Sequence, residues 1–224
     1  DPTDSGDSRL VALERVLADV VAPLAATQPV LMVVLDGCGL PAFVELLDQF
    51  AHAGLEEIGL GGRRRAGLAV LPTVTAVSRT SLLCGELRVG DQGTEKRGLP
   101  AHPAIARLPG PAAVMLHSGD LASGAGTGLP KPVLDALAAD GPRVVAAVVN
   151  TIDDELSRGT FTRSYRIEHL GALHGLLQAA TAANRLVVIT ADHGHVLGVG
   201  LDGAGAVAKG GEGGDRWRVA DRAP

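Results

Sequence analysis

The chain has 224 residues and a formal net charge of −5, with 46% hydrophobic and 20% charged residues. This composition excludes a disordered chain and fits one globular domain with a substantial core. The negative charge does not support a nucleic-acid partner for the domain as a whole, and it leaves only a local basic patch for that role.

The first predicted element is an amphipathic helix over residues 8–26, where leucines and valines recur at helical spacing. The continuous apolar run at residues 30–35 predicts a strand buried on both faces, which is typical of a parallel sheet. A helix is expected to follow over about residues 41–53. We therefore expect an N-terminal helix in residues 1–28 packed on a domain of residues 29–224. The polar start without an initiator Met suggests a fragment of a longer chain.

Further apolar runs predict four more buried strands, at residues 67–71, 112–116, 143–149 and 186–189. Helical patterns lie between several of these runs, the last over residues 167–180. The alternation predicts an α/β fold of the doubly wound kind, with a mostly parallel sheet and helices on both faces. The Gly- and Pro-containing segments 88–111 and 198–214 are expected to be loops, the first of them a candidate substrate-facing insertion.

Acidic residues follow three of the predicted strands. Asp36 comes after the first, the pair Asp153 and Asp154 after the fourth, and Asp192 after the fifth. Ligands of parallel sheets bind beyond the carboxyl ends of the strands, and carboxylates gathered there repel one another unless a cation neutralises them. His193 adds a nitrogen ligand, which favours zinc or manganese over magnesium. Each acid alone also fits an ordinary turn, so the metal interpretation depends on their conjunction.

The stretch PTVTAVSRTSLLCG at residues 72–85 adds a third kind of motif to Asp36-Gly37 and to TADHG at residues 190–194. Together these motifs resemble the alkaline-phosphatase superfamily, whose nucleotide pyrophosphatases carry a similar Pro-Thr-x-Thr stretch that closes on Gly at the same spacing. The sequences LPT, TIDD and DHGHV in this chain look most like PglZ, a domain of bacterial BREX/Pgl phage-defence systems. The resemblance spans roughly residues 29–200.

This resemblance implies hydrolysis of a phosphate mono- or diester through a threonine nucleophile, which a gapless match assigns to Thr75. A metal ion can polarise such a hydroxyl, which is otherwise a poor nucleophile at neutral pH. Arg79 is the candidate phosphate-binding residue, on the first turn of a helix for which Ser78 is the candidate N-cap. The first metal ion, zinc or manganese, would be held by Asp36, Asp192, His193 and Thr75.

A second ion would be held only weakly, by Asp153 or Asp154 and His195. In two-metal members a histidine follows the third acid motif by four residues, whereas Ser157 and Arg158 stand at that spacing here. We therefore expect one firm metal site, with His117 as a reserve ligand.

The expected partners are a phosphate-ester substrate and other phage-defence proteins, in the cytoplasm and away from membranes. Cys38 and Cys84 are expected to be buried thiols rather than a disulfide. The rival hypothesis is a non-catalytic scaffold that retains the metal motif for folding and binds defence partners.

Overall fold

The computed structural model describes residues 10–59, 64–122, 128–158 and 164–195, and the backbone of two short strands near the C-terminus, β7 (Gly213–Gly214) and β8 (Trp217–Arg218). At its centre is a four-stranded sheet in the order β4-β5-β2-β6, with all pairs parallel. These strands are β2 (Val30–Leu35), β4 (Val114–Leu116), β5 (Val144–Val149) and β6 (Leu186–Thr190). The runs that predicted them are thus confirmed as neighbouring parallel strands.

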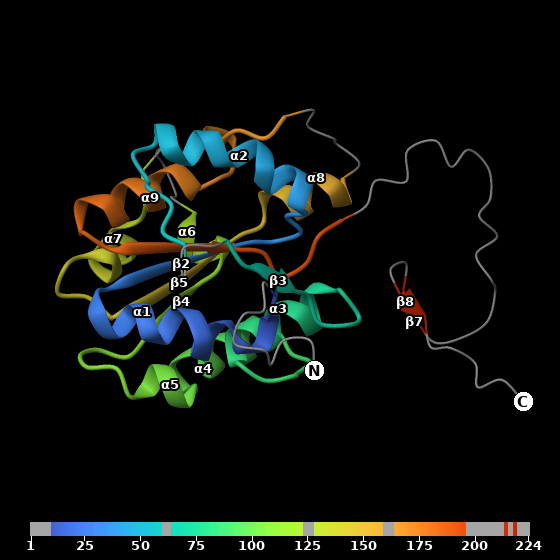
Figure 1. The fold of residues 1–224 in the computed structure, drawn as a ribbon, viewed down its shortest axis with the longest axis horizontal. Helices are drawn as coiled ribbons and strands as arrows, with labels where there is room; N and C mark the ends of the chain where they lie inside the picture. The colour runs from blue at the N-terminus through green and yellow to red at the C-terminus, as the bar shows by residue number, and fades with distance from the viewer. Residues whose placement is uncertain are drawn as a thin grey trace, which may run out of the picture.

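Helices cover both faces of this sheet (Figure 1). One face carries α2 (Leu40–His52), α7 (Lys131–Leu137), α8 (Thr151–Ser157) and α9 (Leu173–Ala182). The other carries α1 (Ala22–Thr27), α3 (Thr75–Cys84), α4 (Gln92–Ala101) and α5 (Pro103–Ala106). Two short turns, α6 (Ser118–Leu121) and η3 (Ile167–His169), complete the connections. The predicted α/β architecture, a parallel sheet flanked by helices, is confirmed.

The central strand β2 separates two hydrophobic cores. Its odd-numbered residues, 31 to 35, pack with α2 and α9, whereas its even-numbered residues, 30 to 34, pack with η2, α3 and α4. Successive side chains of a strand point to opposite faces, so a strand covered on both sides needs apolar residues throughout. All six residues of β2 are at most 1% exposed. The unbroken apolar run is therefore explained by burial on both faces.

Residues 8–26 do not form the single helix that was predicted. In the described part, β1 (Leu10–Ala12) is followed by the 3-10 turn η1 (Leu13–Arg15), the π-helical turn η2 (Leu17–Val21) and α1. Strand β1 pairs in parallel with β3 (Ala66–Leu68), a contact that the local helical pattern cannot reveal. Leu13 and Leu17 are nevertheless buried, whereas Leu10 at the start of the segment is 38% exposed.

The predicted buried strand at residues 67–71 is also wrong. Only Ala66–Leu68 forms a strand, its residues are exposed, and it belongs to the small β1-β3 sheet rather than to the central one. A short apolar run cannot by itself distinguish a central strand from an edge strand.

The segment 88–111 is not the loop that was predicted, because it contains α4 and α5. The side chain of Asp91 caps α4 by accepting a hydrogen bond from Thr94 N at 2.8 Å. Pro103 starts α5, a position where proline is tolerated, whereas Pro100 lies inside α4 near its C-terminal end. The other predicted loop, residues 198–214, lies outside the described residues apart from β7. No described helix is long and apolar enough to cross a membrane.

Candidate metal centre

Asp36, Asp192 and His193 lie together at the carboxyl end of the central sheet. They follow β2 and β6, which are adjacent and parallel, so their chains leave the sheet side by side. His193 Nε2 lies 3.6 Å from Asp36 Oδ1 and 3.7 Å from Asp192 Oδ2. The three residues are 2%, 0% and 2% exposed. This edge of the sheet thus brings together two buried carboxylates and an imidazole, which is a donor set suited to zinc.

The backbone holds one oxygen of Asp192 and leaves the other without a partner. Gly37 N and His193 N both donate to Asp192 Oδ1, at 3.2 Å and 2.8 Å. Asp192 Oδ2 is buried and has no hydrogen-bond partner among the described residues. Buried carboxylate oxygens normally have a partner, so this one fits a cation ligand better than a simple turn.

Thr75 is the first residue of α3, and its hydroxyl faces this cluster. Thr75 Oγ1 lies 3.0 Å from His193 Nε2 and 3.4 Å from Asp36 Oδ1. The N-cap of this helix is Val74, four residues before the predicted cap Ser78. Ser78 is not the cap: its hydroxyl donates to Val70 O at 3.0 Å and accepts from Val70 N at 3.1 Å. These bonds tie the chain after β3 to the first turn of α3.

Of the two candidate acids after β5, only Asp153 faces the cluster. Single oxygen or nitrogen atoms of Asp36, Asp153 and His193 all lie within 4.8 Å of one another. Asp154 is exposed, and its carboxylate lies 3.8 Å from Arg158. Consecutive helical residues point about 100° apart, so only one of the pair can reach the site.

His195 lies beside the cluster without reaching its centre. Its Nδ1 is 2.7 Å from Gly37 O, a contact that ties the segment after β6 to the turn after Asp36. The second, weaker metal site therefore stays a prediction. Asp153, which was expected to belong to that site, lies with Asp36 and His193.

Arg79 is held by two carboxylates, and its role as the phosphate-binding residue stays a prediction. Its side chain is 7% exposed, and Nη1 donates to Asp36 Oδ2 at 2.6 Å. Its Nε contacts both oxygens of Glu95, at 3.1 Å and 3.3 Å. His117, the reserve ligand, contacts Glu95 Oε2 through Nε2 at 2.6 Å and so meets the cluster only indirectly. Sequence reasoning missed Glu95, because it lies in the segment taken for a loop.

The surroundings of the cluster disfavour the ionised form of its carboxylates, Asp36 and Asp192. Burial raises the pKa of Asp192 well above its usual value of 3.8, and the charge of Asp36 raises it further. Burial also raises the pKa of Asp36, against the lowering effect of Arg79. Arg79 therefore only partly balances the negative charge. A divalent cation would favour the ionised form of both groups.

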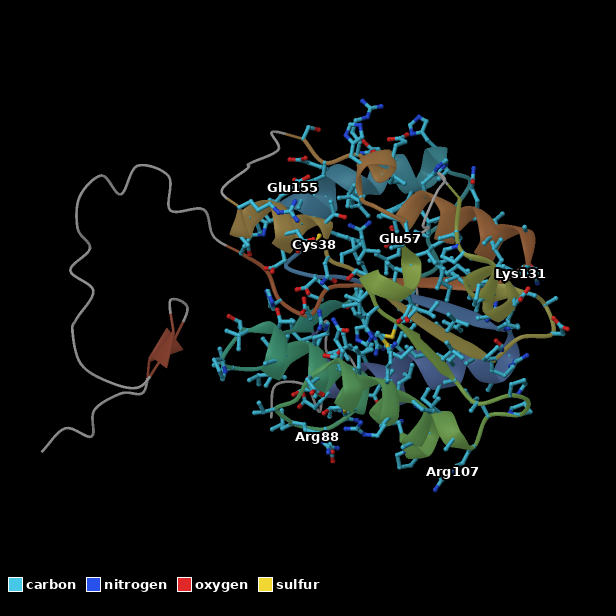
Figure 2. All side chains as sticks on the ribbon, turned by 180° about the vertical axis from the view of Figure 1, so that it is seen from behind. Cys38, Glu57, Arg88, Arg107, Lys131 and Glu155 are labelled. Carbon is cyan, nitrogen blue, oxygen red and sulfur yellow. The ribbon has the colours of Figure 1, made fainter. Side chains whose placement is uncertain are left out.

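A pocket of about 160 Å³ opens beside Asp192 and His193. Its other walls are apolar side chains and glycines, Leu13, Cys38, Gly39, Leu40, Gly67, Ala69, Ala191 and Gly194. Cys38 is 5% exposed, whereas Arg107 and Lys131 lie at the edge of the molecule in Figure 2. Burial, with a smaller contribution from Asp192, raises the pKa of the Cys38 thiol to about 12, so it stays protonated at neutral pH. Both cysteines are free and buried, as expected.

Comparison with known proteins leaves the family open. No protein-family model matches the sequence, and no curated protein aligns with it significantly. The resemblance to PglZ remains a hypothesis based on the motifs at Asp36, Thr75 and Asp192. The function is therefore best approached from the geometry of the cluster itself.

Proposed function

We propose that this chain is a metal-dependent phosphoryl-transfer hydrolase of the alkaline-phosphatase superfamily, acting on phosphate esters through Thr75. The observation that carries the proposal is the position of Thr75 Oγ1, 3.0 Å from His193 Nε2 and 3.4 Å from Asp36 Oδ1. A hydroxyl that shares its surroundings with metal ligands is the arrangement needed to activate a weak nucleophile. A surface threonine at a helix start would have no such neighbours.

In the mechanism, Asp36, Asp192 and His193 would hold the cation with Thr75, and Asp153 would complete the group. A bound zinc or manganese ion would lower the pKa of the Thr75 hydroxyl and neutralise charge on the phosphate. Thr75 Oγ1 would then release its proton to water and form a bond to phosphorus as the ester P–O bond breaks. The leaving alcohol would depart with the electron pair and take a proton from water. Water would afterwards hydrolyse the phosphothreonine.

The start of α3 supports binding of the phosphate at Thr75. This ten-residue helix places its positive end at the nucleophile, where backbone N–H groups favour an anion. The pocket beside Asp192 and His193 offers space for part of the ester.

The test is hydrolysis of nitrophenyl phosphate and bis(nitrophenyl) phosphate by the metal-loaded protein. Thr75→Ala should lower turnover by at least about 100-fold, since loss of the nucleophile removes the covalent route. Thr73→Ala is the matched control, because Thr73 is also half-buried and lies two residues away. Full activity of Thr75→Ala would show that this hydroxyl is not the nucleophile.

A second candidate function is a non-catalytic metal-binding scaffold. The observation in its favour is that Arg79, expected to hold the phosphate, is occupied by Asp36 and Glu95. A scaffold would bind one metal ion and be stabilised by it, yet would hydrolyse neither ester. A role in bacterial phage defence, together with other proteins of such a system, is proposed from the resemblance to PglZ alone.

A further inference from the structure

Glu95 is a buried carboxylate that the metal motif does not include. It lies on α4, is 1% exposed, and is contacted by three side chains, two from α3 and one at the start of α6. Arg79 Nε lies 3.1 Å from Oε1, Thr80 Oγ1 donates to Oε1 at 3.3 Å, and His117 Nε2 lies 2.6 Å from Oε2. A buried charge requires partners of this kind, and their convergence indicates that the position of Glu95 is strongly specified.

Arg79 connects this carboxylate to Asp36. Its Nη1 donates to Asp36 Oδ2, while the other oxygen, Asp36 Oδ1, faces Thr75 Oγ1 and His193 Nε2. Arg79 thus holds one oxygen of Asp36 and leaves the second for the metal cluster. Carboxylates that bind metals are commonly oriented in this way by a hydrogen-bond donor behind them.

An arginine in this place creates a difficulty that Glu95 resolves. A guanidinium on Asp36 carries a full positive charge, which repels a divalent cation bound to the other oxygen of the same carboxylate. Glu95 contacts that guanidinium with both oxygens and cancels its charge. Asp36, Arg79 and Glu95 together then keep one net negative charge beside the cluster.

We propose that Glu95 is a positioning residue of the metal centre, which fixes Arg79 on Asp36 and neutralises it. Arg79 can then orient the Asp36 carboxylate without weakening the attraction of this carboxylate for the metal ion. His117 contacts Glu95 Oε2 at 2.6 Å and so acts on the cluster through Glu95. The inference rests on the proposed metal site, but it does not depend on whether the site is catalytic.

The test compares two isosteric substitutions on the full chain by calorimetric titration with Zn²⁺ and Mn²⁺. Glu95→Gln removes the charge and should weaken metal binding by about 10- to 100-fold, the range found for partners of metal ligands. Thr80→Val removes a hydrogen bond to the same carboxylate but no charge, and metal affinity should stay within about threefold. Both substitutions alter the hydrogen bonds of Glu95, but only Glu95→Gln removes its charge. A larger loss of metal affinity in Glu95→Gln would therefore be due to the charge. Arg79→Gln combined with Glu95→Gln should recover part of the affinity, since no uncompensated guanidinium remains.

The outcomes separate this inference from the proposed hydrolase function. Unchanged affinity in folded Glu95→Gln, or equal losses in Glu95→Gln and Thr80→Val, would overturn the assignment of Glu95 even if the ester assays succeed. A wild-type protein that binds metal but hydrolyses no ester would refute the hydrolase and leave Glu95 to be judged by the titrations. Wild-type protein that binds neither ion would overturn both. If Glu95→Gln does not fold, Arg79→Lys tests the same proposal, because an ammonium group cannot span the carboxylates of Asp36 and Glu95. Wild-type metal affinity in Arg79→Lys would refute the proposal.

Discussion

Asp153 occupies the space that a side chain at Gly37 would fill. A Cβ added at Gly37 would lie 3.2 Å from both Cβ and Oδ1 of Asp153, and Gly37 has a φ of +71°. The turn after β2 therefore needs glycine for its conformation and also for the approach of an acid from α8. Asp153 is one of the three residues whose ligand atoms lie within 4.8 Å of one another, the others being Asp36 and His193.

The first prediction follows from this contact. Gly37→Ala should lower metal affinity by at least about tenfold, or about 1.4 kcal/mol, because it displaces Asp153. Gly54→Ala is the matched control, since Gly54 also has a positive φ, +84°, but has nothing within 4 Å of its added Cβ. Both variants should lose roughly 1–2 kcal/mol of stability through backbone strain. Urea unfolding and metal titration together would check this, and equal metal affinities would contradict it.

The second prediction distinguishes the two adjacent acids of α8. Asp153→Asn should weaken metal binding by at least about tenfold, because it removes a charged ligand atom from the group. Asp154→Asn should leave affinity within about twofold, because exposed ion pairs such as the one with Arg158 contribute little. Titration of both variants with Zn²⁺ measures the difference. A larger effect of Asp154→Asn would mean that Asp154, and not Asp153, faces the metal group.

The third prediction concerns pH. The pKa values of Asp36 and Asp192 in the folded protein lie above 3.8, so above that pH the unfolded chain releases protons that the folded chain still holds. The stability of metal-free protein should therefore fall as the pH rises from 3.8 through the folded-state pKa values, by up to about 1.4 kcal/mol per pH unit for each proton.

Bound metal should oppose this loss, because it binds the ionised carboxylates. Urea unfolding across this pH range, with chelator and with added Zn²⁺, would show two curves that diverge as the pH rises. Asp192→Asn should reduce the slope of the metal-free curve. Parallel curves with and without metal would indicate that these acids do not bind the ion.

The fourth prediction concerns stability at the opposite end of the sheet. Arg185 is 5% exposed and donates to the carbonyl oxygens of residues 30, 136, 137, 138 and 142. Arg185→Met should cost about 3 kcal/mol or more in urea unfolding, because several buried acceptors lose their partner. Arg143→Met, which removes a bond to Ala25 O, should cost less. Metal affinity of the folded variants should not change, and an equal loss of stability in the two variants would contradict the prediction.

Local sequence patterns predicted the central sheet and the place of the site. The apolar runs of β2 and β5 could be recognised because a strand covered on both faces cannot carry polar residues, whereas β6, at the edge of the sheet, is only half-buried. Since parallel strands end at the same edge, Asp36, Asp192 and His193 were expected to meet there, and the structure brings them together. The same reasoning failed for β1 and β3, whose pairing depends on a contact between residues far apart in the chain.

The chemistry around the cluster was decided by tertiary structure. Arg79 and Glu95 lie on different helices. The glycines and prolines near Glu95 led to the prediction of a loop where α4 lies. Whether Asp153 or Asp154 faces the metal group depends on the phase of α8, which is set by how that helix packs after β5. The sequence alone determined which ends of the strands carry acids, because that follows from burial along each strand. Which charges face one another across elements depends on packing, which no local pattern records.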